Sequence, residues 1–115
     1  IEDFGVGFFT KYGDGGVDIS PIADLMKSEV YKIGEEFNII DEIMNAAPTD
    51  GLWNDGRTDE QQLGASYESL EWAMNNHDAA KLSNKQKDII KTYKNHRKIN
   101  LHKMVPIPIF KKDKV

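Results

Sequence analysis

Apolar residues recur every three or four positions after residue 24, the spacing of a helix with one apolar face. Leu25, Val30, Ile33 and Phe37 follow this spacing. They predict a helix that begins at Asp24, whose side chain is a suitable N-cap, and ends near Phe37. A second, short helix is expected at residues 41–45.

Three N-terminal capping signals divide the second half of the chain. A Ser or Thr followed three residues later by Gln can close a reciprocal pair of hydrogen bonds at a helix start. This pattern predicts a short helix from Thr58 to Leu63 and a long helix after Ser83, and Ser66 caps another helix between them. The apolar faces of the last two helices are expected to contain Tyr67, Leu70 and Met74, and Ile89, Ile90, Tyr93 and the stem of Arg97.

The remaining segments have extended or irregular patterns. Residues 17–22, VDISPI, alternate in polarity after the glycine turn YGDGG and predict a short strand. Because a lone strand leaves its backbone groups unpaired, other strands must come from preceding sequence or from a partner chain. We therefore expect this chain to be part of a longer protein. Residues 46–57 predict a surface loop. The prolines in the segment LHKMVPIPIF, residues 101–110, predict an extended tail that lies on another surface.

The amino-acid composition excludes several classes of protein. The 115 residues fit one domain, and the formal net charge of -4 argues against a general nucleic-acid surface. The absence of cysteine excludes disulfides and thiolate metal ligands. No apolar run reaches the roughly 18 residues that span a bilayer, so we expect a cytoplasmic protein without a membrane partner.

Lys27 lies near the expected start of the first long helix, where unpaired N–H groups create a partial positive charge. A cation is disfavoured there unless an anion is also present. A phosphate at the helix end would make the lysine favourable, and we expect Lys11 and Asp18 to share its pocket. The alternative is that Lys27 is a solvated side chain.

Other polar residues flank turns. Lys11 and Asp18 lie on either side of the glycine turn, where a ligand can approach the backbone closely. Thr49 can donate a hydrogen bond to a phosphate, or it can form a local turn. His102 and Lys103 precede the proline segment and would ordinarily be surface residues.

Four motifs in order are more specific than any of these residues alone: GFFTKYGDGGVDISPIADLMKSEV, PTDGLW, RTDEQQLGASYESL and HKMVP. Together they resemble the C-terminal half of ammonia-dependent NAD synthetases over essentially the whole chain. The resemblance implies an α/β fold of the adenine-nucleotide alpha-hydrolase type, Rossmann-like, with a parallel sheet. This chain would supply about one strand and mostly helices. It also implies a cytoplasmic homodimer.

The resemblance implies a ligase that uses ATP and Mg²⁺. ATP adenylates the nicotinate carboxylate of deamido-NAD, and ammonia then displaces AMP to give NAD. By motif, Lys11, Asp18, His102 and Lys103 would hold deamido-NAD. Lys27 and Thr49 would contact ATP, and Glu2 would bind magnesium, with Asp3 as the alternative ligand.

The family's pyrophosphate-binding SGGxDS loop does not occur in these 115 residues. The resemblance therefore assigns residues 1–115 to the C-terminal portion of an NAD synthase domain. We expect these residues alone to be inactive and to bind ATP weakly. Ammonia could arrive free or from a glutaminase domain or subunit.

Two other functions stay open. One is an ATP-dependent adenylating amidotransferase of the GMP synthetase type, which the TKYGDGG and TDEQQLG runs disfavour. The other is a non-catalytic helical module that binds a protein through the capped helices after Thr58.

Overall fold

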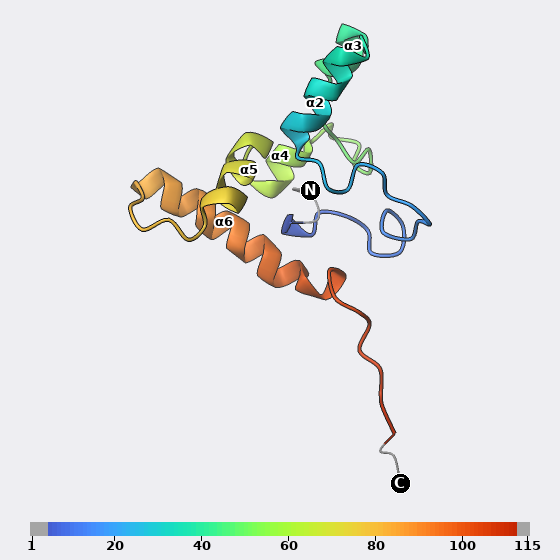
Figure 1. Cartoon of the computed structure of the whole chain (residues 1–115), viewed down its shortest axis with the longest axis vertical. Helices are drawn as coiled ribbons and strands as arrows, with labels where there is room; N and C mark the ends of the chain where they lie inside the picture. The colour runs from blue at the N-terminus through green and yellow to red at the C-terminus, as the bar shows by residue number, and fades with distance from the viewer. Residues whose placement is uncertain (1–4, 113–115) are drawn as a thin grey trace.

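The computed structural model describes residues 5–112, which are helical and irregular and contain no strand (Figure 1). The helices are α2 (Lys27–Glu36), α3 (Asp41–Met44), α4 (Asp59–Leu63), α5 (Tyr67–Asn76) and α6 (Asn84–Asn100), followed by the 3-10 helix η1 (Leu101–Lys103). The expected helical content is therefore present. The parallel sheet stays a prediction, because the described residues contribute no strand to it.

The predicted capping signals in the second half of the chain are confirmed. At α4, Thr58 N–H donates to Gln61 Oε1 at 2.8 Å, and Gln61 N–H donates back to Thr58 Oγ1 at 3.3 Å. The same reciprocal pair begins α6 at Ser83, and the hydroxyl of Ser66 accepts a backbone bond at the start of α5. Each of these helices begins where a local side chain satisfies its first N–H groups.

Helix α2 begins later than predicted. Met26 occupies the N-cap position, and its N–H donates to Glu29 Oε2 at 2.8 Å. The expectation that Asp24 caps this helix is therefore wrong, because Glu29 supplies the carboxylate from within the first turn. The predicted end is confirmed, with Phe37 at the C-cap, and so is the short helix α3.

The predicted strand at residues 17–22 is also wrong. The backbone is irregular over residues 17–20 and forms turns from residue 21, in which Ala23 N–H donates to Ser20 O at 3.2 Å and Leu25 N–H donates to Ile22 O at 3.0 Å. Ile19 is 76% exposed. Alternating polarity makes a strand only when a neighbouring strand accepts its hydrogen bonds, and residues 5–112 provide no such neighbour.

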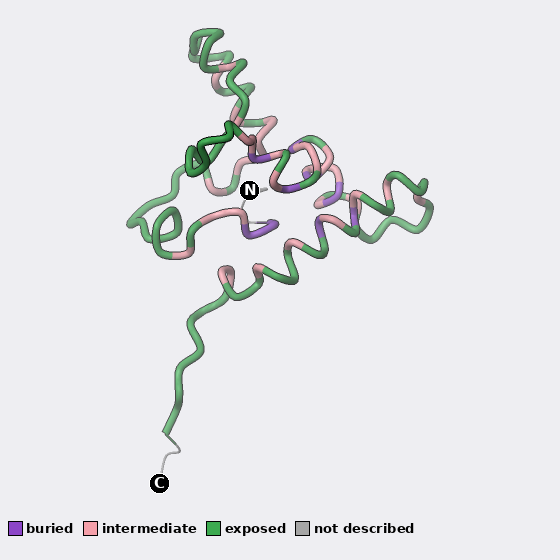
Figure 2. The backbone as a smooth tube through the Cα atoms, turned by 180° about the vertical axis from the view of Figure 1, so that it is seen from behind, coloured by how far each residue is buried: buried purple, intermediate pink, exposed green. Residues whose placement is uncertain are grey.

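The buried core lies where α4, α5 and α6 meet the first described residues, which include Val6 (Figure 2). Phe8 and Met74 are among the half-buried side chains that pack against it. His96 connects α6 to the end of α4, because its Nε2 lies 2.8 Å from Leu63 O. The buried apolar residues of the described part are Val6, Leu63, Tyr67, Leu70, Ala73, Ile90 and Tyr93.

The molecule is elongated, with extents of 62 × 39 × 31 Å and a radius of gyration of 17.0 Å. A compact chain of this length would have a radius near 13 Å, by the usual scaling with length. Helices α2 and α3 form an arm on one side, and the C-terminal residues extend away from the helices (Figure 1). The described part has no helix with both the length and the apolar character that a bilayer crossing requires.

After Met104 the C-terminal tail is extended as predicted, but residues 101–103 form the 3-10 helix η1 instead. After Ile107 the tail lies on no other surface of the described part. It leaves the helices after Met104, and Phe110 is 94% exposed. The prolines prevent helix, and the part of the tail after Ile107 finds no apolar surface among the described residues to cover it.

Candidate functional site

Lys11 and Lys103 line the same cavity, of about 620 Å³, although they lie far apart in sequence. The cavity lies between the glycine-rich segment at residues 5–15, the end of α6 and the first residues of the tail. Lys11 Nζ donates to His102 O at 2.5 Å and lies 3.4 Å from Val105 O. These bonds connect the glycine turn to the C-terminal segment and bring two predicted site residues together.

Three side chains of α6 and η1 satisfy consecutive backbone carbonyls near the start of the chain. The backbone at residues 5–6 is helical, and carbonyls at a helix end have no intrahelical partner. The donors are spaced three residues apart, so they lie on one side of the helix, and two of them are cations, which suit a helix C-terminus. The bonds are Arg97 Nη1 to Gly5 O at 3.1 Å, Asn100 Nδ2 to Val6 O at 2.9 Å and Lys103 Nζ to Gly7 O at 2.9 Å.

Gly7 is required at the centre of this arrangement. Its φ of 73° lies in the left-handed region, and a Cβ at this position would overlap the Cβ of Asn100. Only glycine combines this backbone conformation with such a close approach. The glycine therefore allows α6 to approach the segment that carries Lys11.

A second cavity, of about 370 Å³, lies beside the first and also includes Lys103. Its other walls are residues 8–10, Asp14, and Asp50 and Leu52 from the loop at residues 46–57. Lys103 lines both cavities. The PTDGLW motif therefore lies next to the site of the two lysines.

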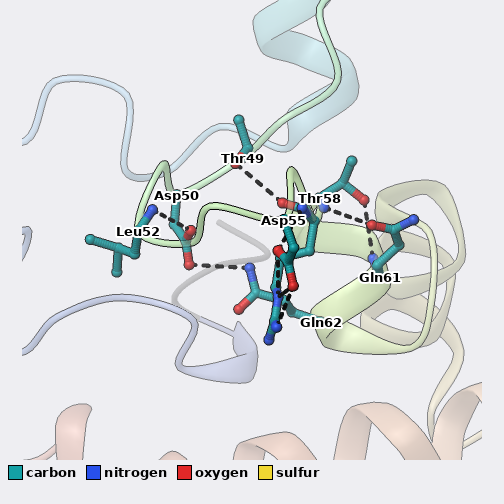
Figure 3. A network of polar contacts seen from close by, with 8 residues as sticks. Thr49, Asp50, Leu52, Asp55, Thr58, Gln61 and Gln62 are labelled. Atoms are coloured by element: carbon teal, nitrogen blue, oxygen red, sulfur yellow. Dashed lines mark hydrogen bonds and ion pairs between the residues drawn. The ribbon is translucent and has the colours of Figure 1, made fainter.

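The loop at residues 46–57 is held by its own side chains and by Gln62 of α4 (Figure 3). Thr49 Oγ1 donates to Arg57 O at 3.3 Å and accepts a bond from Gly51 N–H at 3.1 Å. Asp50 accepts bonds from Leu52 N–H at 3.0 Å and from Gln62 Nε2 at 3.1 Å. The bond from Leu52 N–H lowers the pKa of the Asp50 carboxyl below its ordinary value. The loop is exposed, as predicted, and Thr49 makes the local turn that was its alternative interpretation.

An ion pair holds the C-terminal end of the same loop. Arg57 Nη2 lies 2.5 Å from Asp55 Oδ2, and Arg57 Nε lies 3.0 Å from both carboxylate oxygens. The side-chain hydrogen bond between them lowers the pKa of Asp55 and raises that of Arg57. The guanidinium lies 4.3 Å from the ring centre of Trp53, so the pair also positions this tryptophan.

Lys27 lies in a different cavity from Lys11, so the expectation of one shared pocket is wrong. It is the first residue of α2, is half-buried, and lines a cavity of about 560 Å³ between α2 and α5. Its Nζ lies 4.6 Å from the ring centre of Tyr67. Glu60, Glu68 and Glu71 line the same cavity. A phosphate is expected at the start of α2, but the chain already supplies a negative charge there. The Glu29 carboxylate accepts a hydrogen bond from Met26 N–H.

The other predicted site residues are more dispersed. Asp18 is exposed and lines none of the cavities described above. His102 is exposed, and its backbone carbonyl is the group that meets Lys11. Glu2 and its alternative Asp3 lie outside the described residues. Within residues 5–112, no three His, Asp or Glu side chains gather in a way that could hold a metal ion.

Arg97 and Asn100 were not identified from sequence as site residues. Arg97 was expected to contribute only its stem to the apolar seam of α6, but it lines the cavity of Lys11 and Lys103. The sequence signal that could have found these residues is their spacing, because positions 97, 100 and 103 share one side of a helix.

Comparisons with known proteins agree on one family. The family model described as NAD synthase matches residues 2–114. An NH(3)-dependent NAD(+) synthetase of Alkaliphilus metalliredigens is 42% identical over 103 residues, which is 90% of this chain and 39% of that protein. One from Sulfolobus acidocaldarius is 33% identical over 114 residues, or 92% of this chain and 40% of that protein. This chain spans about two fifths of the length of these two relatives.

Proposed function

Because the chain belongs to the NAD synthase family, we propose that it forms part of an ATP-dependent ligase that makes NAD. The reaction adenylates the nicotinate carboxylate of deamido-NAD and releases pyrophosphate. Ammonia then attacks the acyl adenylate, forms the amide and releases AMP. Activation is needed because a carboxylate resists nucleophiles, whereas AMP is a good leaving group. The curated relatives are named as NH(3)-dependent, which supports ammonia as the nucleophile.

The observation that carries this proposal is the cavity lined by both Lys11 and Lys103. Both residues match family motifs that hold deamido-NAD. The fold brings them together, because Lys11 Nζ donates to the carbonyl of His102, which precedes Lys103 and lies 91 positions from Lys11. Ammonium groups are well suited to phosphate oxygens, and the aromatic ring of Phe9 lines the same cavity. The cavity therefore offers a charged part and an apolar part to a dinucleotide.

We assign the remaining residues by motif. Asp18 and His102 would complete the deamido-NAD site, and Thr49 and Lys27 would contact ATP. Thr49 is the better supported of these two, because its loop borders Lys103, whereas Lys27 lies in a cavity with three glutamates.

Magnesium would offset the negative charge of the ATP phosphates. Magnesium is commonly held by one or two carboxylates together with phosphate oxygens, so it does not need a cluster of protein ligands. Glu2 is our proposed ligand, with Asp3 as the alternative. The residues of the described part bind and orient the nucleotides in this proposal.

At the level of the whole protein, we propose that the chain is the C-terminal portion of a cytoplasmic, homodimeric NAD synthase domain with an α/β fold and a parallel sheet. Its ammonia would be free or delivered by a glutaminase domain or subunit. We assign it no nucleic-acid or membrane partner.

The test measures NAD formation from deamido-NAD, ATP and ammonia by the natural protein that carries these residues. Lys11→Ala and Lys103→Ala should each reduce kcat/KM about tenfold or more, since a charged hydrogen bond contributes about 1.5 to 3 kcal/mol. Lys98→Ala removes a charge from the exposed surface of α6 and should leave kcat/KM unchanged. Absence of NAD formation by the natural protein would refute the proposed function.

A further inference from the structure

Arg97 is a third cation at the cavity that Lys11 and Lys103 line. We propose that Arg97 binds the diphosphate group of the dinucleotide substrate there, together with the two lysines. This inference rests on the proposed function and adds to it a residue that the family motifs do not include.

The guanidinium of Arg97 is anchored by one nitrogen only. Its Nη1 donates to Gly5 O at 3.1 Å and lies 3.6 Å from Met104 Sδ. Within residues 5–112, its Nε and Nη2 make no hydrogen bond or ion pair. These two nitrogens form the side edge of the guanidinium, whose parallel N–H groups match two oxygens of a phosphate. The anchored nitrogen fixes the group while its bidentate edge stays available for a ligand.

The charges around the cavity are unbalanced. Arg97, Lys11 and Lys103 donate hydrogen bonds only to backbone carbonyls and a thioether sulfur, all of them neutral. No aspartate or glutamate of the described part lines this cavity, although the chain has 19 acidic residues against 15 basic ones. Three cations gathered without a carboxylate repel one another, and a bound anion would relieve that repulsion. The second cavity beside it does contain Asp14 and Asp50, so the larger cavity is the better anion site.

A diphosphate fits this arrangement better than a single phosphate. Its two phosphoryl groups can accept bonds from the arginine edge and from two ammonium groups at once. The dinucleotide contributes such a group, and so do ATP and free pyrophosphate. We choose the dinucleotide because Lys11 and Lys103 match the family's deamido-NAD motifs.

The experiment uses the natural protein and three variants, Arg97→Ala, Arg97→Lys and Lys98→Ala. Calorimetry measures the Kd for deamido-NAD, for ATP and for inorganic pyrophosphate, each alone, and steady-state kinetics gives KM for both substrates. Lys98 is the adjacent cation on α6, is exposed, and lines none of the described cavities, so its variant controls for overall charge. Lysine at position 97 keeps the charge and can donate to Gly5 O, but it lacks the planar edge.

Arg97→Ala should raise the Kd and KM for deamido-NAD about tenfold or more, and Arg97→Lys should raise them by a smaller factor. ATP binding should change less than twofold, and Lys98→Ala should match the natural protein. Thermal unfolding separates lost binding from lost folding, because Arg97→Lys should unfold at the natural temperature and still bind deamido-NAD more weakly.

Unchanged deamido-NAD binding in a folded Arg97→Lys or Arg97→Ala variant would overturn the inference, whether or not the natural protein makes NAD. An increase confined to the Kd for ATP would also overturn it, because the diphosphate at Arg97 would then belong to ATP. If the natural protein bound deamido-NAD through Arg97 but made no NAD, the binding site would stand and the proposed reaction would fail.

Discussion

At the scale of single residues, the cavity depends on contacts between positions that are distant in sequence. Lys11 and Lys103 could be identified from their motifs, but their common cavity could not, because tertiary packing brings them together. Arg97 and Asn100 belong to no such motif and act through backbone carbonyls near the start of the chain. Their partners are defined only when α6 lies against Gly7.

Gly7→Ala should be among the most destabilising substitutions in the chain. It places a Cβ where Asn100 already lies, in a backbone conformation that disfavours side chains. Gly56→Ala is a matched control, because its φ of 69° is similar and nothing lies within 4 Å of the added Cβ. Urea unfolding should show a loss about 1 to 3 kcal/mol larger for Gly7→Ala, from overpacking. Equal losses would show that α6 does not approach Gly7 this closely.

Tyr67→Phe tests the buried carboxylate beside the core. Asp59 is 8% exposed, and its Oδ2 accepts a bond from the Tyr67 hydroxyl at 3.1 Å. Its Oδ1 has no hydrogen-bond partner among residues 5–112. Removing the hydroxyl leaves the carboxylate less satisfied still, so the free energy of unfolding should fall by about 1 to 3 kcal/mol. Tyr31→Phe removes a hydroxyl with no hydrogen bond described in residues 5–112, and should change stability by less than about 0.5 kcal/mol. Similar losses in the two variants would contradict the assignment.

At the scale of elements, local signals were sufficient for helices and insufficient for the strand. The starts of α4, α5 and α6 were predicted because Thr58, Ser66 and Ser83 satisfy backbone groups within their own turn. A strand cannot satisfy its backbone groups locally, and residues 17–22 are irregular and enter a turn at residue 21 instead. The predicted start of α2 is wrong because the residue at the N-cap position, Met26, is not of a type that usually caps helices. The Glu29 side chain accepts the Met26 N–H instead.

The loop at residues 46–57 should respond to acid through Asp55. Its pKa is lowered by the hydrogen bond from Arg57, so the pair stabilises the loop at neutral pH. This contribution is present above the ordinary aspartate pKa of about 3.9 and is lost as the pH falls through the lower folded value. Because Arg57 lies over Trp53, the fluorescence of Trp53 should change in that acidic range.

The measurement is a pH titration of Trp53 fluorescence in a Trp72→Phe background, since the chain has two tryptophans. Far-UV circular dichroism on the same samples marks the pH range in which the helices persist. Asp55→Asn should remove the transition that the ion pair causes. A midpoint at or above the value of a free aspartate would be inconsistent with the ion pair.

At the scale of the whole molecule, much apolar surface is uncovered. The arm formed by α2 and α3 contains no buried residue, and Ile107, Ile109 and Phe110 extend from the helices with more than half of their surfaces exposed. The core is confined to α4, α5, α6 and the first described residues. The cavity of Lys11 and Lys103 lies at the edge of this core, where the glycine segment meets the end of α6.

The central claim is that this cavity holds the dinucleotide of an NAD synthase. A crystal structure of the natural protein with deamido-NAD tests it most directly. The account predicts that the diphosphate oxygens lie at hydrogen-bond distance, about 2.7 to 3.2 Å, from the side-chain nitrogens of Lys11 and Lys103. A dinucleotide bound elsewhere, with both lysines still bonded only to backbone carbonyls, would contradict it.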